Sequence, residues 1–217
     1  MIESEMNMNG GIPLVMKAAQ QTKYGNARDV LILRDDVPVP RQLSPKQILV
    51  RVHAAAINPV NGRLLSGEFT LIKRYSFPHI PGSDAAGVIV DVGTAVKRLR
   101  VGDQVYGETG FEGGSYAEYV RADESLFALK PKNLTMVEAA AVPLACQTSY
   151  QALLKKASPP IGKGSHVFIC GGASATGLFG IQLAKAAGAT VATTCSKRNV
   201  PLLEKLGWSS FVDLNYR

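Results

Sequence analysis

The residues best suited to chemistry lie between Ser165 and Lys185, where the sequence reads as a short strand, a turn of small residues and a helix. The small side chains leave the backbone amides of the turn accessible, and the first amides of the following helix have no intrahelical acceptor. Such a turn can hold a phosphate group. The residues of the turn are Gly171, Gly172, Ala173, Ser174, Ala175, Thr176 and Gly177.

This turn matches the glycine fingerprint of dinucleotide-binding proteins imperfectly. Gly171 and Gly177 occupy the ends of a G-x-x-G-x-x-G pattern, but Ser174 stands where the middle glycine would lie. A glycine-rich turn alone is a weak signal, because a tightly packed connection between a strand and a helix uses the same residues without binding anything. Both interpretations stay open at this point.

The segment after the turn favours a nucleotide. Residues 189–195 form a β-branched second strand, and the next position is where an NAD-binding chain places an acidic residue on the ribose 2′-hydroxyl. Here the chain has Ser196, Lys197 and Arg198. A hydroxyl and two cations suit a 2′-phosphate, so we expect NADPH rather than NADH as the cofactor. The alternative is a solvated, basic start of the next helix.

Composition and charge narrow the class of protein. The chain has 217 residues, 46% of them hydrophobic and 19% charged, as is usual for a globular protein. Its net charge of +7 is spread along the chain without a long run of like charges, so nucleic-acid binding is not expected. A small molecule is the expected partner.

The expected location is the cytoplasm. Cys146, Cys170 and Cys195 form no C-x-x-C pair, which indicates a reducing compartment. No stretch is apolar over the length of about 18 residues that a membrane span requires. Residues 1–15 are acidic and rich in Asn and Gly, unlike a signal peptide, and we expect them to form a flexible extension.

Two domains are expected after this extension. Residues 16–134 show short strands separated by Gly, Pro and Asp, which is typical of an all-β-rich domain. Residues 135–217 alternate helices and strands, which is typical of a parallel α/β domain. In the first domain we predict strands at 30–33, 47–55, 86–92, 104–106, 116–120 and 126–129, and a helix at 59–65. In the second we predict helices at 136–142, 147–156 and 201–206, and strands at 167–169, 189–195 and 211–214.

Polar side chains of the first domain are further candidates for a site. Asn58 and Asn61 lie at the start of the predicted helix, directly after a buried strand, and such positions commonly line a cleft. Asn58 could cap the helix or contact a ligand, and Asn61 could face solvent or substrate. Asp84 could orient a neighbour or accept backbone amides, and we favour a structural role. His79, between a proline and an apolar residue, is expected to be a packed histidine.

Two kinds of catalytic site lack support in the sequence. A zinc site needs three or four Cys, His or carboxylate ligands at a workable spacing, but all three cysteines lie beyond residue 145 and the histidines are scattered. The G-x-S-x-G motif of a serine nucleophile is missing from the sequence. A bound redox cofactor is therefore expected to supply the chemistry.

Five further stretches carry a family resemblance. They are M-K-A at 16–18, A-I-N-P-V-N at 56–61, F-P-H-I-P-G-S-D-A-A-G-V at 77–88, V-G-D-Q-V-Y-G at 101–107 and G-G-S-Y-A-E-Y at 113–119. Together with the turn they resemble, in order, the zinc-independent quinone oxidoreductases. These zeta-crystallin-like proteins belong to the medium-chain dehydrogenase/reductase superfamily. The resemblance runs from about residue 16 to the end of the chain.

The resemblance implies a GroES-like catalytic domain followed by a Rossmann domain. It also implies hydride transfer from NADPH to a quinone or an α,β-unsaturated carbonyl, with Asn58 and Asn61 as candidate catalytic residues. Zinc-dependent relatives carry a cysteine ligand near the position of Asn58, and Gly-His-Glu where this chain has Gly-Ser-Asp at 82–84. No metal is therefore expected.

The resemblance further implies where the cofactor binds. Asn58 and Thr148 are expected beside the nicotinamide, and residues 173–176 around the pyrophosphate. The residues expected around the adenosine 2′-phosphate are Ser196, Lys197 and Tyr216.

Two departures from the family pattern matter. Several members carry a tyrosine proposed to assist protonation where this chain has Phe69, so we expect a water molecule to protonate the product. The chain also ends after three of about six Rossmann strands, which predicts a partial Rossmann domain lacking the C-terminal third and a homodimer that covers the exposed sheet edge. The alternative function is a catalytically impaired nucleotide-binding or structural, crystallin-like paralogue or fragment of this fold.

Overall fold

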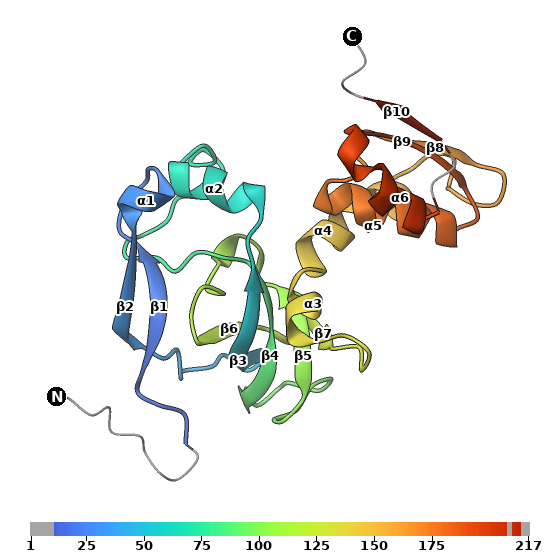
Figure 1. The fold of residues 1–217 in the computed structure, drawn as a ribbon. Coiled ribbons are helices and arrows are strands. Elements are labelled where there is room, and N and C mark those ends of the chain that lie inside the picture. Colours follow the sequence, from blue (N-terminus) through green and yellow to red (C-terminus); the bar gives the residue numbers. More distant parts are fainter. Residues whose placement is uncertain (1–10, 208–209, 214–217) are drawn as a thin grey trace. The chain divides into compact units, whose positions relative to one another are not determined.

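The computed structural model describes residues 11–207 and 210–213. The chain divides into two compact units, Met1–Pro143 and Leu144–Arg217, and each has its own sheet and core (Figure 1). The flexible extension predicted for residues 1–15 lies mostly outside the described residues. The first strand, β1 (Val15–Gln21), begins at its end.

Antiparallel strands dominate the first unit. β1 pairs with β2 (Leu31–Pro38) in a two-stranded sheet. A five-stranded sheet has the order β6-β3-β4-β5-β7. Its strands are β3 (Gln47–Ala56), β4 (Asp84–Val92), β5 (Gln104–Glu108), β6 (Tyr119–Asp123) and β7 (Phe127–Leu129). The all-β-rich first domain is confirmed.

The strands at one edge of this unit differ from those predicted. β1 is missing from the predicted strands because it consists largely of Ala, Gln and Lys, which are poor strand formers. Pairing with β2 stabilises β1. β2 itself begins at Leu31 rather than at the predicted Val30. β6 begins later than predicted, because the residues before it pair with β1. The amide of Ala19 donates to the carbonyl oxygen of Tyr116 at 2.9 Å.

Short helices connect and cover these strands. They are α1 (Ala27–Val30), α2 (Pro59–Ser66) and α3 (Met136–Ala140), with 3₁₀ turns η1 (Gly110–Glu112) and η2 (Glu124–Leu126). α2 follows β3 and has Pro59 in its first turn, as predicted. α3 packs Ala139 and Ala140 against Ala86 of β4. Because of this packing α3 lies in the first compact unit, whereas the sequence pattern places the boundary after residue 134.

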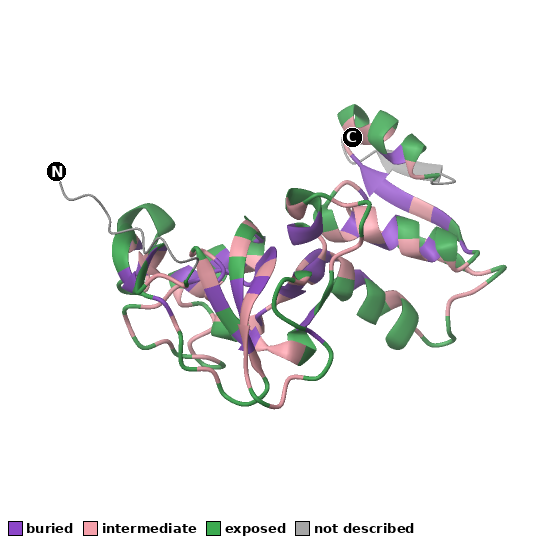
Figure 2. Cartoon of the chain, turned by 90° about the horizontal axis from the view of Figure 1, so that it is seen from below, coloured by how far each residue is buried: buried purple, intermediate pink, exposed green. Residues whose placement is uncertain are grey.

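Buried residues lie mainly in the strands and helices, and the connecting loops are mostly exposed or intermediate (Figure 2). The core of the first unit forms separate clusters around β3, whose first half is buried. Ile48 and Val50 pack in one cluster with Phe127, and Leu49 packs in another with Met16. Successive residues of a strand face opposite sides of the sheet, so β3 contributes to both clusters. Burying one such side chain contributes about 1.5–3 kcal/mol, so these clusters anchor the first half of β3 in the core of the first unit.

A three-stranded parallel sheet with the order β10-β9-β8 is the centre of the second unit. The strands are β8 (His166–Ile169), β9 (Thr190–Cys195) and β10 (Ser210–Asp213). The helical segments are α4 (Pro143–Tyr150), the π-helix η3 (Gln151–Lys155), α5 (Ala175–Ala186), the 3₁₀ turn η4 (Lys197–Asn199) and α6 (Val200–Lys205). This strand order is that of the first half of a Rossmann sheet, which confirms the predicted fold class.

Apolar side chains of α5, α6 and β9 form the core of the second unit. Ile181, Val191 and Leu203 are fully buried in it. β8 is an edge strand of the described sheet, and its Phe168 is 57% exposed. The turn between β8 and α5 therefore starts from the edge of a small, well-packed sheet.

Candidate functional site

The predicted phosphate-binding turn lies between β8 and α5. Ser174 is the N-cap of α5, and its Oγ accepts a hydrogen bond from the amide of Gly177 at 3.0 Å. Ser174 thus replaces a glycine of the fingerprint with a helix cap. Ser174 and Ala175 are exposed, and helix geometry leaves the first amides of α5 without an intrahelical acceptor. An anion at this helix start would be bound by amides and by the helix dipole.

Two glycines of the turn allow close backbone packing that a side chain would prevent. A Cβ at Gly177 would lie 2.3 Å from the carbonyl oxygen of Gly171. A Cβ at Gly172 would lie 2.1 Å from the Oγ1 of Thr193. The turn can therefore lie directly against β9 and the start of α5 only with glycine at these positions.

Hydrogen bonds fasten the turn to the end of β9. The amide of Gly171 donates to the Oγ1 of Thr194 at 2.7 Å, and the amide of Gly172 donates to the carbonyl oxygen of Thr194 at 2.9 Å. The carboxyl ends of parallel strands meet at one edge of the sheet, so the residues after β9 lie at the same edge as the turn. The end of β9 and the turn therefore form one site.

The basic residues predicted to bind a 2′-phosphate lie at this edge. Lys197 and Arg198 are exposed in η4, and none of the ion pairs found in the described part of the chain contains either. The Oγ of Ser196 accepts a hydrogen bond from the Nδ2 of Asn199 at 3.1 Å. The donor set of free amides, two cations and a hydroxyl fits a ligand with two phosphate positions.

The resemblance also implies cofactor contacts for Thr148 and Tyr216, of which the structure describes only Thr148. Thr148 is exposed on α4, and its Oγ1 donates to the carbonyl oxygen of Leu144 at 2.7 Å. Tyr216 lies outside the described residues. The sequence reasoning missed Ser149, which is buried and whose Oγ donates to the carbonyl oxygen of Thr176 at 2.6 Å. This bond holds α4 against the turn. It could not be predicted from the sequence, because the residues around Ser149 do not indicate a partner 27 positions away.

The polar residues of the first unit form a buried cluster where β3 leads into α2. The Nδ2 of Asn58 donates to the Oδ2 of Asp84 at 2.9 Å. Asp84 begins β4 opposite Ala56 and is fully buried, while Asn58 is 8% exposed. Asp84 therefore accepts a hydrogen bond from a neighbouring side chain, which is compatible with the first of the two roles considered for it.

Asn61 lies inside this cluster. It is 3% exposed, and its Oδ1 accepts from the amide of Asn58 at 2.8 Å and from the hydroxyl of Tyr116 at 3.1 Å. Burial, assisted by the negative charge of Asp84, raises the pKa of Tyr116 to about 12, so its hydroxyl remains a donor at neutral pH. These bonds occupy Asn61 within the fold rather than present it to a ligand.

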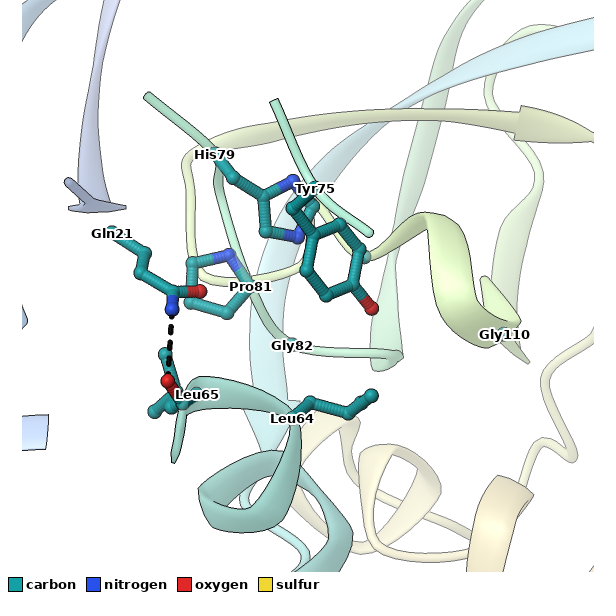
Figure 3. Close-up of a pocket in the computed structure, with 9 residues that line it drawn as sticks. Gln21, Leu64, Leu65, Tyr75, His79, Pro81, Gly82 and Gly110 are labelled. Atoms are coloured by element: carbon teal, nitrogen blue, oxygen red, sulfur yellow. Dashed lines mark hydrogen bonds between the residues drawn. The ribbon is translucent and has the colours of Figure 1, made fainter. Parts of the chain in front are cut away.

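Figure 3 shows a small cavity in the first unit, lined by His79, Tyr75 and Gln21 among others. Its volume is about 10 Å³, which is room for about one water molecule. The ring of His79 stacks on that of Tyr75 with 4.0 Å between centroids. Burial lowers the pKa of His79 to about 4. His79 is thus a packed, neutral histidine, as predicted.

Residues 11–207 and 210–213 contain neither a metal-binding cluster nor a membrane-spanning helix. In these ranges no group of three or more His, Cys, Asp or Glu side chains could hold a metal ion. Within the same part of the chain, every helix is too short or too polar to cross a membrane.

Known proteins share both the sequence and the fold of this chain. Residues 44–132 match the alcohol dehydrogenase GroES-like domain. A 2-methylene-furan-3-one reductase of Solanum lycopersicum is 42% identical, over 97% of this chain and 55% of the relative. An NADPH-dependent alkenal/one oxidoreductase, chloroplastic, of Arabidopsis thaliana is 39% identical, over 94% of this chain and 54% of the relative. The chain spans about half the length of these curated relatives.

Solved structures give the same result. The quinone oxidoreductase of Coxiella burnetii has a TM-score of 0.79 and 31% identity, covering 94% of this chain and 63% of that one. The Escherichia coli quinone oxidoreductase complexed with NADPH has a TM-score of 0.80 and 25% identity, covering 93% and 59%. The fold thus defines a chain with a GroES-like part and the first half of a Rossmann part. The chain belongs to the medium-chain dehydrogenase/reductase superfamily, as the resemblance predicts, and its relatives include proteins named as quinone and alkenal oxidoreductases.

Proposed function

We propose that this chain is part of an NADPH-dependent reductase of quinones or α,β-unsaturated carbonyls that works by hydride transfer without zinc. One observation carries the proposal: the phosphate turn is fastened to the end of β9, directly before Lys197 and Arg198. One edge of the sheet thereby offers a pyrophosphate site and a cationic site. Relatives named as NADPH-dependent alkenal/one and quinone oxidoreductases support the same reading.

The preference for NADPH follows from charge. A chain that binds NADH presents a carboxylate to the ribose 2′-hydroxyl, and a carboxylate repels a 2′-phosphate. Here the exposed Lys197 and Arg198 offer charge-assisted hydrogen bonds instead. Ser196 and Tyr216 stay proposed contacts of the same phosphate.

The proposed roles in catalysis rest on the buried cluster of the first unit. Bound NADPH would supply the hydride. Asn58 is proposed to contact the nicotinamide end, with Asn61 holding the Asn58 backbone in place. An amide and a hydroxyl, at Asn58 and Ser83, are poor zinc ligands, which supports a reaction without zinc. Phe69 has no hydroxyl, so a water molecule is the proposed proton donor.

Titration calorimetry with NADPH and NADH tests the cofactor proposal. We expect saturable NADPH binding and at least tenfold weaker NADH binding, because the 2′-phosphate adds charge-assisted contacts. Lys197→Ala should weaken NADPH binding about tenfold and leave NADH binding unchanged, while Lys205→Ala, on α6, serves as the matched control. Equal affinity for both cofactors would contradict the assignment.

Steady-state oxidation of NADPH in the presence of a simple quinone or enone tests the activity. Turnover would support the proposed reaction. Nucleotide binding without turnover would instead favour the catalytically impaired nucleotide-binding or structural paralogue. A homodimer and a cytoplasmic location stay part of the proposal, and the mass of the particle in solution, together with fractionation of cells, tests them.

A further inference from the structure

The side-chain amide of Asn58 has a defined orientation. Its Nδ2 lies 2.9 Å from the Oδ2 of Asp84, inside the protein. An amide oxygen facing this carboxyl oxygen would place two acceptors in contact, so the amide nitrogen must face Asp84. The Oδ1 of Asn58 is then the group directed away from Asp84. Asn58 is also the N-cap of α2 and forms a capping box with Asn61, but an amide oxygen has two lone pairs and can accept from a second donor.

Both ends of this pair are held by the fold. Asp84 is fully buried and begins β4, where it is paired with Ala56 of β3. The backbone of Asn58 donates to Asn61, which in turn accepts from the hydroxyl of Tyr116. The amide of Asn58 therefore cannot rotate without breaking a buried hydrogen bond, which costs about 1–3 kcal/mol.

We propose that Asp84 is a positioning residue that fixes Asn58 so that its Oδ1 accepts a hydrogen bond from the ligand. The ligand group at this point is then a donor, such as a ribose hydroxyl or a carboxamide of the cofactor, rather than the carbonyl oxygen of an enone or quinone. This inference rests on the proposed function, because it takes Asn58 as the residue that contacts the nicotinamide end of NADPH.

Two variants of Asp84, similar to it in size, separate its effect on the orientation of Asn58 from the effects of its charge and its packing. Asp84→Leu removes the acceptor, and Asp84→Asn removes the charge but keeps one oxygen that can accept from Asn58. Calorimetry on the full chain should show NADPH binding about tenfold weaker in Asp84→Leu and within about threefold of the unmodified chain in Asp84→Asn. Adenosine 2′,5′-bisphosphate, which lacks the nicotinamide end, should bind all three proteins equally.

The outcomes distinguish this inference from the proposed function. No NADPH binding by the unmodified chain overturns both. NADPH binding that is equal in all three proteins, or weakened equally in both variants, overturns only the role of Asp84. Weaker binding of the bisphosphate by Asp84→Leu would show general damage to the fold, and would likewise overturn the positioning role.

A second measurement needs no variant, in case Asp84→Leu does not fold. In the unmodified chain, the side-chain amide resonance of Asn58 in a ¹⁵N-labelled sample should shift when NADPH is added. It should not shift when adenosine 2′,5′-bisphosphate is added. A resonance that responds to neither ligand, or to both alike, overturns the proposal.

Discussion

The amide of Gly171 donates a hydrogen bond of 2.7 Å to the hydroxyl of Thr194. This bond joins the first residue of the phosphate turn to the end of the neighbouring strand. It sets the position of the turn relative to Lys197, because only a few residues separate Thr194 from the basic segment.

Thr194→Val should weaken this connection. Valine has the shape of threonine but no acceptor, so the Gly171 amide loses its partner, at a cost of about 1–3 kcal/mol. We expect a lower free energy of unfolding in urea and weaker NADPH binding in calorimetry. Thr190→Val, at an exposed position of the same strand, is the control and should change neither quantity. Unchanged NADPH affinity in Thr194→Val would mean that the bond does not position the turn.

Gly172→Ala should disturb the turn itself. The new Cβ would lie 2.1 Å from the Oγ1 of Thr193, and that hydroxyl is held by its bond of 2.7 Å to the carbonyl oxygen of Ile169. Such overpacking costs about 1–3 kcal/mol, and NADPH binding should fall more than tenfold. At Gly162 an added Cβ meets nothing within 4 Å, so Gly162→Ala should bind NADPH normally. The two variants would be compared by thermal unfolding and calorimetry.

His79 should make the stability of the first unit depend on pH. Burial lowers its pKa to about 4 from the ordinary value of 6.5, so between these values the unfolded chain binds more protons than the folded one. The contribution of His79 to stability is complete above about pH 6.5 and is lost as the pH falls towards 4. Urea unfolding of His79→Gln should therefore show a smaller loss of stability in this range than the unmodified chain.

His53→Gln is the matched control for this pH dependence, since His53 is exposed on β3 of the same unit. It should retain the slope of the unmodified chain. A slope that stays unchanged in His79→Gln would contradict the burial of a neutral imidazole.

Tyr116→Phe tests the support of Asn61. The variant removes the hydroxyl that donates to the Oδ1 of Asn61 at 3.1 Å, so we expect a loss of about 0.5–1.5 kcal/mol in the free energy of unfolding. Tyr119→Phe, on β6, is the comparison, because the described residues provide no hydrogen bond to that hydroxyl. An equal, small effect of both substitutions would show that the Asn61 bond adds no stability.

Local features of the site could be predicted from the sequence. The turn from Gly171 to Gly177 and the basic residues after β9 depend on neighbouring residues, whose backbone preferences act over a few positions. Long-range partners could not be predicted in this way. β1 is made of poor strand formers and exists because β2 and the residues before β6 pair with it.

The sequence by itself therefore predicted most of the strands and helices, though not β1, and also the glycine-rich turn and the basic segment at Lys197. Only the tertiary structure decided that Asn58 donates to Asp84, that Thr194 accepts from the turn, and that Asn61 lies buried within the fold. The physical reason is that turns, caps and strand patterns follow from the local chain. The partner of a buried polar group depends instead on which distant strands pack together, and burial makes that partner obligatory.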